Sequence, residues 1–506
     1  MSSVVPGTTG SSSKADVTDL VDAVLSRANS DVDLPAVEHD GVVTTYGEFC
    51  RAAFQAAGAV RKAVSAPCPR VLIAIPRSVS AYTGMLGTLL AGGTFCPIDI
   101  EGPAERNATI AKLFSPHVIL YTGKPPEFLD ACPATTPRVD AASKDGPLLD
   151  IPAIEYSDIA YVVFTSGSTG QPKGVKIGRQ AFSHFLKVSQ QYFVPAHGSR
   201  WGQFSNLGYD LAVMDVFMAL TQGRVLIPLS GSKDRLMPAL AIKKHGVNIW
   251  QSVPSVLEMM TRGKHVTSDM LGSLRVMSFC GEPLLPRHLE TLFAARPDLE
   301  VFNTYGATET TGFNTLNRLD AKNFRESCAS AFVALGTNVP GWNVQLHGED
   351  VPDEGEIVVS SDWLALGYWA DEERTRLVFR DVKSPSGEMQ RAYFTGDRGE
   401  RKDGQLYFKC RHDRQVKVRG ERIELDEVDH ALREMGFAES FTVFDGSDLH
   451  SFVETPLDVD QERVRAILTK KLPFHAVPKR IIGMTNLPRN ANGKLDRTAI
   501  KKLVVT

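Results

Sequence analysis

The chain has 506 residues, too many for one hydrophobic core, because single cores usually stop growing near ~250–300 residues. Its 56 Lys and Arg residues nearly balance 59 Asp and Glu residues, and the formal net charge of -3 argues against a general nucleic-acid binder. Hydrophobic residues make up 43% and charged residues 23%, as in soluble globular proteins, and no apolar run approaches the ~20 residues that span a bilayer.

The seven cysteines include no CxxC pair, which argues against both a zinc knuckle and a disulfide framework. Their low density is typical of a reducing cytosol, so we expect a cytoplasmic protein. Residues 1–16 lack a basic segment followed by an apolar one and are therefore predicted to form a flexible tail, not a signal peptide.

From about Val17 the pattern alternates between helices and strands. TDLVDAVLSRA predicts an amphipathic helix, RVLIAIP a buried strand, and SAYTGMLGTLLAGGTFCPID a helix, a glycine turn and a strand. Short apolar runs that end in polar residues or glycine then recur in HVILYTG, GRVLIPL, VNIWQSVP, LRVMSFCGE and LEVFNTYG. This alternation favours βαβ units in largely parallel sheets, whose ligands gather at the carboxyl ends of the strands.

The pattern changes near residue 400. DGQLYFKCRHDRQVKVRGERIELDEVDHALREM predicts a strand, a turn, a strand and a helix. We therefore predict an α/β fold in which a large N-terminal domain of layered α/β subdomains spans residues 17–412. A small α+β domain is predicted over residues 413–506.

The strongest local motif is YVVFTSGSTGQPKGV, Tyr161–Val175. A buried strand runs into a loop of hydroxyl and glycine residues with Lys173 close behind, and such loops place backbone N–H groups, hydroxyls and positive charge around phosphate. The loop lacks the GK[ST] ending of a Walker A motif, which argues against a P-loop NTPase. A solvated Ser/Gly turn is the plain structural alternative.

Three further stretches have both a functional and a structural interpretation. NTYGATETT places the ring of Tyr305, which can stack on adenine, near Glu309, which can bind Mg²⁺. Taken alone, this stretch is better explained as a surface turn with a core tyrosine. In YFTGDRG, Asp397 can accept two ribose hydroxyls or form an Asx turn. In NGKLDR, Lys494 can bridge a carboxylate and a phosphate or lie exposed in a turn.

These stretches resemble motifs of the adenylate-forming (ANL) superfamily, which includes acyl-CoA synthetases, luciferases and the adenylation domains of non-ribosomal peptide synthetases. LLAGGTFCPID and RQVKVRGERIELDEVD also fit, in the expected order, so the resemblance covers nearly the whole chain. The resemblance implies that the enzyme uses ATP and Mg²⁺ and that Glu309 coordinates the metal. It implies a nucleotide site made of Thr165, Ser166, Gly167, Ser168, Thr169, Gly170, Lys173, Gly281, Glu282, Asn303, Tyr305, Gly306, Asp397 and Arg411.

The same resemblance implies catalytic roles for Thr308, at the α-phosphate, for Glu309 and for Lys494. Asp413 matches the hinge about which the C-terminal domain swings, bringing Lys494 in for adenylation and withdrawing it for thioester formation. Two positions depart from the usual motifs: Ala307 stands where proline is common, and Cys410 stands where a glycine normally precedes the arginine.

The segment FSNLGYDLAVMDVFMAL carries Asp210 where amino-acid-activating members hold the substrate ammonium. A helix N-cap is the structural alternative for this aspartate. YDLAVMD and VMSFCGEPL resemble D-alanine–D-alanyl carrier protein ligases, in which the cysteine matching Cys280 packs beside the substrate α-carbon; packing as a small buried hydrophobe remains open for it. By alignment, the remaining pocket residues are Leu211, Met214, Gln251, Ser278, Thr304, Gly312 and Phe313.

Leu211, Met214 and Thr304 agree with the D-alanine ligases, whereas Gln251, Ser278, Gly312 and Phe313 depart from them. D-alanine is the leading candidate, and glycine, serine, other small amino acids and β-amino acids stay open. The resemblance implies that the amino acid is activated as aminoacyl-AMP and passed to the phosphopantetheine thiol of a carrier protein. Because no carrier-like GxDS sequence is present, we expect the carrier to act in trans.

Three other functions compete with this prediction. An acyl-CoA synthetase would use an organic acid, which Asp210 opposes. A nucleotide-binding sensor with the same fold is opposed by Lys173, Glu309, Asp397 and Lys494. A natural-product adenylating enzyme for a different small or β-amino acid is the third alternative.

Overall fold

A computed structural model describes residues 18–142, 156–167, 171–193, 198–348, 353–383, 387–411, 413–489 and 495–504. The predicted N-terminal tail and four predicted site residues, Ser168, Thr169, Gly170 and Lys494, lie outside these ranges. No described helix is both long and apolar enough to cross a membrane.

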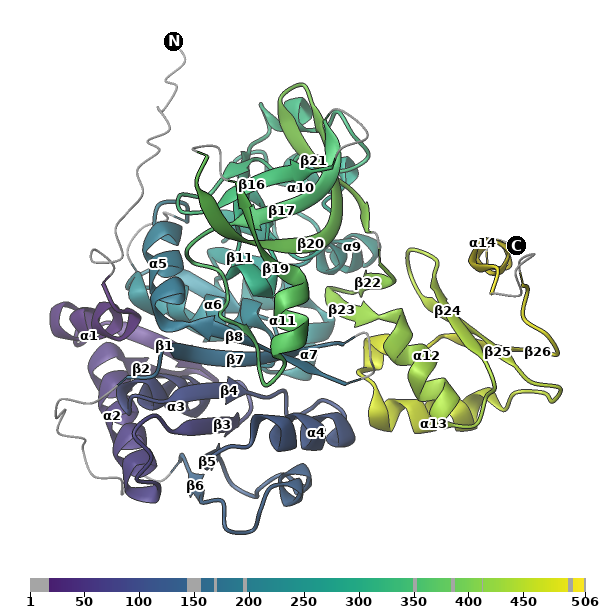
Figure 1. Ribbon diagram of the computed structural model, residues 1–506. Helices are drawn as coiled ribbons and strands as arrows, with labels where there is room; N and C mark the ends of the chain where they lie inside the picture. The colour runs from purple at the N-terminus through teal and green to yellow at the C-terminus, as the bar shows by residue number, and fades with distance from the viewer. Residues whose placement is uncertain are drawn as a thin grey trace.

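The helices confirm the predicted alternation and lie around the sheets (Figure 1). The α-helices are α1 (Leu20–Ser30), α2 (Tyr46–Ala63), α3 (Val79–Leu90), α4 (Ala104–Phe114), α5 (Arg179–Ser189), α6 (Asp210–Thr221), α7 (Ser232–Leu236), α8 (Pro238–His245), α9 (Pro254–Arg262), α10 (Pro286–Ala295), α11 (Glu372–Val378), α12 (Leu425–Glu434), α13 (Gln461–Lys471) and α14 (Arg497–Lys502). Short 3₁₀ helices are η2 (Glu127–Ala131), η3 (Thr308–Thr310), η4 (Phe324–Ser327) and η5 (Phe474–Ala476).

Within the described ranges, two large sheets have mostly parallel cores, as predicted. The first has the spatial order β15 (Thr337–Asn338), β14 (Thr315–Leu319), β13 (Glu300–Tyr305), β12 (Val276–Phe279), β11 (Ile249–Ser252), β9 (Arg200–Gln203), β10 (Val225–Pro228), β1 (Pro35–His39) and β2 (Val42–Thr45). The second has the order β18 (Gly367–Tyr368), β8 (Lys173–Gly178), β7 (Ile159–Thr165), β4 (Thr94–Pro97), β3 (Arg70–Ala74), β5 (Val118–Tyr121) and β6 (Arg138–Asp140). Antiparallel strands form both edges of the first sheet and one edge of the second.

An antiparallel sheet follows that the alternation rule did not predict. Its strands are β16 (Asn343–His347), β17 (Glu354–Ser360), β20 (Met389–Lys402), β19 (Phe379–Lys383) and β21 (Gln405–Arg411). The long strand β20 carries Asp397 and pairs it with Arg411 on β21, so this sheet builds one wall of the site.

The last part of the chain forms two small sheets. They consist of β22 (Gln415–Val418) with β23 (Glu421–Glu424), and of β24 (Ser440–Phe444), β25 (Leu449–Glu454) and β26 (Arg480–Met484). The sequence predicted two strands separated by a turn before α12, whereas the structure has three, β21, β22 and β23. The additional turn is at Arg419 and Gly420, whose left-handed φ angles are 52° and 84°, and it makes β22 and β23 a hairpin. The hairpin extends toward the larger body of the molecule in Figure 1.

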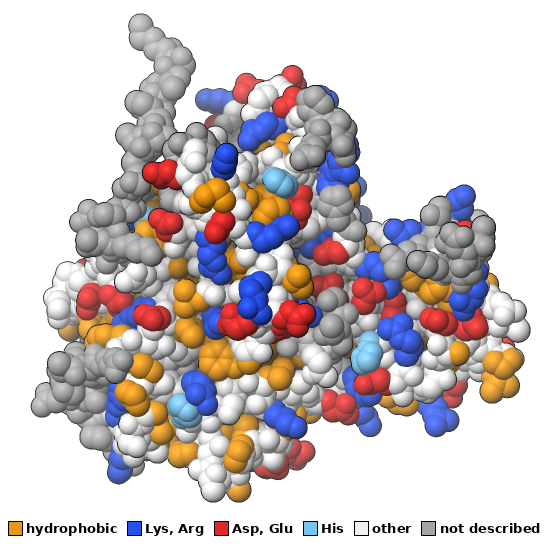
Figure 2. Space-filling view, viewed as in Figure 1, with side chains coloured by type: hydrophobic (Ala, Val, Ile, Leu, Met, Phe, Trp, Pro, Cys, Tyr) orange, Lys and Arg blue, Asp and Glu red, His pale blue; other side chains and the backbone are white. Residues whose placement is uncertain are grey.

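The main core unites side chains of both large sheets with α3 and α6. Almost every residue of α3 and α6 is buried, because these helices are apolar all round and not only along one stripe. Outside the core, side chains of both charge signs are interspersed over the visible face, as the near-zero net charge predicts (Figure 2).

Candidate active site

A cavity of about 1010 Å³ lies between the carboxyl ends of the strands and the β22–β23 hairpin. Its walls include most of the predicted nucleotide and amino-acid residues, although they are spread from residue 165 to residue 411. The predicted residues that line it are Thr165, Ser166, Asp210, Leu211, Met214, Cys280, Gly281, Glu282, Gly306, Thr308, Gly312, Asp397 and Arg411.

The phosphate-loop motif lies at the turn between β7 and β8, where Thr165 pairs with Lys173. A side chain at Gly167 would place its Cβ 2.1 Å from the Gln171 carbonyl oxygen, so only glycine fits this turn. The buried Thr165 hydroxyl makes no hydrogen bond to the described residues, and the Ser166 hydroxyl donates to the Arg422 carbonyl oxygen at 2.6 Å. The loop therefore offers a free hydroxyl to a ligand.

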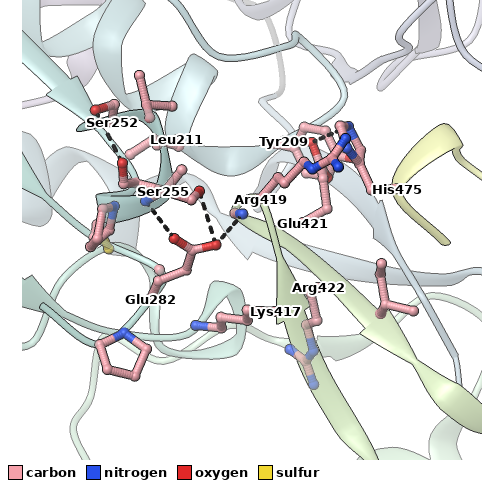
Figure 3. A pocket seen from close by; sticks show the side chains of 18 of the residues that line it. Tyr209, Leu211, Ser252, Ser255, Glu282, Lys417, Arg419, Glu421, Arg422 and His475 are labelled. Carbon is pink, nitrogen blue, oxygen red and sulfur yellow. Dashed lines mark hydrogen bonds and ion pairs between the residues drawn. The ribbon is translucent and has the colours of Figure 1, made fainter. Parts of the chain in front are cut away.

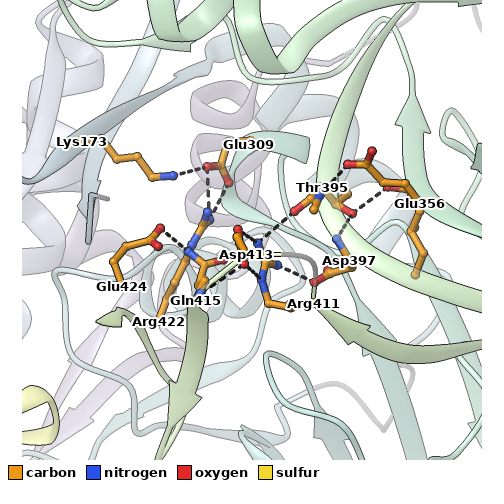
Figure 4. Close-up of polar contacts among 12 residues, drawn as sticks. Lys173, Glu309, Glu356, Thr395, Asp397, Arg411, Asp413, Gln415, Arg422 and Glu424 are labelled. Atoms are coloured by element: carbon orange, nitrogen blue, oxygen red, sulfur yellow. Dashed lines mark hydrogen bonds and ion pairs between the residues drawn. The ribbon is translucent and has the colours of Figure 1, made fainter. Parts of the chain in front are cut away.

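Glu309 is completely buried and is surrounded by positive charge (Figure 4). The Arg422 guanidinium donates to its two oxygens at 3.0 and 3.2 Å, the Tyr368 hydroxyl donates at 2.8 Å, and Lys173 Nζ lies 3.4 Å away. Burial opposes the charged carboxylate, but Arg422 and Lys173 hold the pKa of Glu309 well below its ordinary value. Burial and Arg422 also lower the pKa of Lys173, to about 8.

Glu309 can also be tested as a magnesium ligand. No group of three or more His, Cys, Asp or Glu side chains in the described ranges forms a metal cluster. Mg²⁺ at nucleotide sites is commonly held by one or two carboxylates together with phosphate oxygens and water, so a single glutamate beside a phosphate loop fits this pattern. In the observed arrangement Arg422 contributes the positive charge at this carboxylate.

Asp397 lies at the centre of a second polar network (Figure 4). Its carboxylate accepts a hydrogen bond from the Tyr305 hydroxyl at 2.7 Å and pairs with the Arg411 guanidinium. Arg411 also binds Asp413 through two hydrogen bonds of 2.8 Å, which ties the predicted hinge residue to this wall. These residues come from β13, β20 and β21 and from the segment that follows.

Asp210 begins α6 and is held by two donors. The Thr308 hydroxyl donates at 2.6 Å, and the backbone N–H of Leu211 donates at 2.8 Å. Burial raises the pKa of Asp210, and neither hydrogen bond fully offsets it. Lys417 acts on this carboxylate electrostatically, but no described cation forms an ion pair with it, so it is suited to receive a cation from a ligand.

The hairpin adds functional groups to which the sequence interpretation assigned no role. Lys417, Arg419, Glu421 and Arg422 line the cavity, although all four belong to the RQVKVRGERIELDEVD stretch of the small C-terminal part. The sequence signal for this role was the set of charged residues on both sides of the turn glycine Gly420. The hairpin is anchored where Glu282 accepts a hydrogen bond from the Gly420 N–H (Figure 3).

Glu282 also caps the start of α9, because it accepts hydrogen bonds from the Ser255 backbone N–H at 2.8 Å and from the Ser255 hydroxyl at 3.2 Å. Farther out, Arg106 on α4 donates to Glu427 on α12 at 2.9 Å. These contacts join the small C-terminal part to the larger body in this pose.

The other predicted residues lie just outside the cavity wall. Asn303 donates its amide to the carbonyl oxygens of Val333 and Ala334, and the Thr304 hydroxyl donates to Phe279. Phe313 packs edge-on against Phe185 in the core. Gln251 and Ser278 are fully buried behind the wall.

With this geometry established, comparison with known proteins gives the family. The model of the AMP-binding enzyme family matches residues 25–369. The chain belongs to this family, within the adenylate-forming superfamily.

A D-alanine–D-alanyl carrier protein ligase of Listeria monocytogenes serotype 4b is 29% identical, over 96% of this chain and 99% of its own length. The hybrid PKS-NRPS synthetase TAS1 of Pyricularia oryzae is 30% identical over 95% of this chain, but the match covers 28% of that much longer protein. The crystal structure of the Vibrio cholerae adenylation domain AlmE, in complex with glycyl-adenosine-5'-phosphate, superposes with a TM-score of 0.81 at 23% identity, covering all of both chains.

Proposed function

We propose that this enzyme activates a small amino acid as aminoacyl-AMP and transfers it to the phosphopantetheine thiol of a separate carrier protein. The single observation that carries the proposal is Asp210, a carboxylate in the cavity wall with two neutral donors and no described ion-pair partner. A desolvated carboxylate favours a cation, and the α-ammonium of an amino acid supplies one. The relatives' name makes D-alanine the first substrate to test.

In the first half-reaction the amino-acid carboxylate attacks the α-phosphorus of ATP, giving the mixed anhydride and pyrophosphate. The chain supplies position and charge. Thr165 and Lys173 hold phosphate oxygens, Asp397 holds the ribose hydroxyls, and Asp210 holds the ammonium. Glu309 would bind Mg²⁺, which neutralises phosphate charge when bound. Lys494 is proposed to bridge the attacking carboxylate and the α-phosphate.

In the second half-reaction the thiol attacks the acyl carbonyl, and AMP leaves. The observed hairpin pose supports a role in this step, because Lys417 and Arg422 then line the cavity from the C-terminal side. We propose the domains as residues 17–412 and 413–506, with Asp413 as the hinge. In this scheme the hairpin and Lys494 occupy the site at different times.

The test is ATP–pyrophosphate exchange over a panel of small amino acids in both enantiomers, β-alanine, aryl acids and fatty acids. We expect exchange with amino acids, and loss of it in Asp210→Asn with retained ATP binding. Exchange with aryl or fatty acids alone would contradict the proposal and favour an acyl-CoA synthetase. ATP binding without exchange for any acid would favour a nucleotide sensor.

A further inference from the structure

Two buried polar side chains beneath the cavity have no hydrogen-bond partner among the described residues. Both amide atoms of Gln251 and the hydroxyl of Ser278 are unpaired, and both side chains are fully buried. They are direct neighbours, because Gln251 on β11 is in register with Ser278 on β12. Buried polar groups are normally satisfied, so three unpaired atoms at one place require an explanation.

Three polar side chains close to them, Ser252, Thr304 and Gln203, do have hydrogen-bond partners. The Ser252 hydroxyl accepts from the Trp250 ring N–H at 2.9 Å, and the Thr304 hydroxyl donates to Phe279 at 2.9 Å. The Gln203 amide donates to Ser205 and accepts from Tyr82. Gln251 and Ser278 therefore differ from these neighbouring side chains, although the Thr315 hydroxyl on β14 of the same sheet is also unpaired.

The pair lies on the side of the sheet that leads to the cavity. Side chains alternate along a strand, so Ser278 points to the same face as Cys280, two residues farther on, and Cys280 lines the cavity. The preceding residues on this face, Ile249 and Val276, belong to the same apolar cluster as Met214 of α6, which also lines the cavity. Gln251 and Ser278 thus form a buried polar pair, here called the polar floor. Along β12, Ser278 lies about 7 Å from Cys280, because two residues of a strand span that distance.

An amino acid bound through Asp210 would direct its side chain toward this floor. Cys280 and Asp210 are close enough to influence each other electrostatically, so the substrate α-carbon would sit beside both. A polar atom two or three bonds from the α-carbon, plus a hydrogen bond of about 3 Å, spans the distance to the floor. Gln251 and Ser278 have no exposed surface in this structure, so a substrate must displace a side chain of the cavity wall to reach them. Met214 lines the cavity, and its unbranched side chain is flexible enough to move.

We propose that Gln251 and Ser278 bind an uncharged hydroxyl or carboxamide in the side chain of the amino-acid substrate. The inference rests on the proposed function and narrows it from small amino acids in general to those with a short polar side chain. An amide and a hydroxyl can each donate and accept, which suits a neutral partner, whereas a buried charge there would lack a counter-ion. Alanine would leave all three atoms unpaired.

The test uses the full-length enzyme and ATP–pyrophosphate exchange with pairs of similar size: serine against 2-aminobutyrate, homoserine against norvaline, and asparagine against leucine, each in both enantiomers. We expect the polar member of at least one pair to be favoured by about ten-fold or more in kcat/KM, and to exceed alanine. The double variant Gln251→Leu/Ser278→Ala should reverse that preference.

A matched control separates specificity from folding. Gln251→Leu removes an unpaired amide and should hold or raise Tm, whereas Gln203→Leu removes a paired one and should lower it. Preference for alanine or for the apolar member of every pair, or variants that weaken both members equally, would overturn the inference while leaving the proposed function intact. Exchange only with acids that lack an amine would instead end the proposed function itself.

Discussion

The large body and the β22–β23 hairpin contribute to the same cavity in different ways. Side chains of the body, such as Asp397 and Asp210, are held by neighbours from that body, including Tyr305 and Thr308. The hairpin's Arg422 instead pairs with Glu309, a carboxylate of the larger body. The body therefore has a preformed site, whereas the hairpin's charges depend on its pose. Four changes would test this difference, from the largest expected effect to the smallest.

Lys494→Ala should have the largest effect, because it should separate adenylate formation from transfer. We expect adenylate formation to fall about 1,000-fold, because the charge that develops at the α-phosphate loses its lysine, while transfer from a preformed adenylate is spared. Single-turnover assays of each half-reaction measure the two steps. Lys501→Ala, an exposed lysine on α14, is the control and should change neither. Equal loss of both steps in Lys494→Ala would contradict the alternating-domain scheme.

Glu309→Gln removes the carboxylate that the body and the hairpin share. We expect exchange to fall about 100-fold, because Lys173 loses its counter-charge beside the phosphates and the carboxylate that would bind Mg²⁺ is gone. Steady-state exchange kinetics give the loss, and thermal unfolding reports whether the fold is kept. The control is Glu372→Gln, whose carboxylate pairs with Lys176 at the exposed surface. Activity unchanged in Glu309→Gln would remove this residue from the site.

Gly420→Ala tests the hairpin pose alone. At φ 84° a Cβ is strained and would lie 2.6 Å from both Val253 methyl carbons, so docking of the hairpin should weaken. We expect transfer to the carrier thiol to fall about ten-fold, a docking loss of ~1.4 kcal/mol, with little change in exchange. Gly436→Ala has the same left-handed backbone strain at φ 97° but open space around it, and it should leave transfer unchanged. A larger loss in exchange than in transfer would assign this pose to adenylation.

The smallest expected effect is a pH dependence of kcat/KM for ATP that comes from Lys173. Its pKa is lowered to about 8, so the side chain is charged below that pH and neutral above it. We expect kcat/KM for ATP to fall about four-fold between pH 7 and pH 8.5, since neutral lysine binds phosphate less well. Lys173→Arg should flatten the profile in this range. A parent profile that is flat would show that Lys173 does not bind the phosphate in its charged form.

Part of this result could be predicted from sequence. Apolar runs, glycine turns and 3.6-residue periodicity are local signals, and they predicted helices α1 and α3 and strands β3, β4, β5, β7, β10, β11, β12 and β13. They did not single out strands β6, β8 and β9. The antiparallel sheet carrying Asp397 was missed, because its order depends on long-range pairing of β17 with β20. Motif order alone placed Thr165, Asp210 and Asp397 in one site, and the cavity brings them together.

The sequence by itself determined the α/β class, the phosphate-loop glycine, and which carboxylates and lysines were available for chemistry. These are properties of single residues and short patterns. Only the tertiary structure decided which distant groups meet. It pairs Glu309 with Arg422, lets Glu282 accept a hydrogen bond from the hairpin, and leaves Gln251 and Ser278 without hydrogen-bond partners among the described residues. Pairing and its absence are relations between distant segments, because a hydrogen bond or an unmet donor exists only when the folded chain places both positions in space.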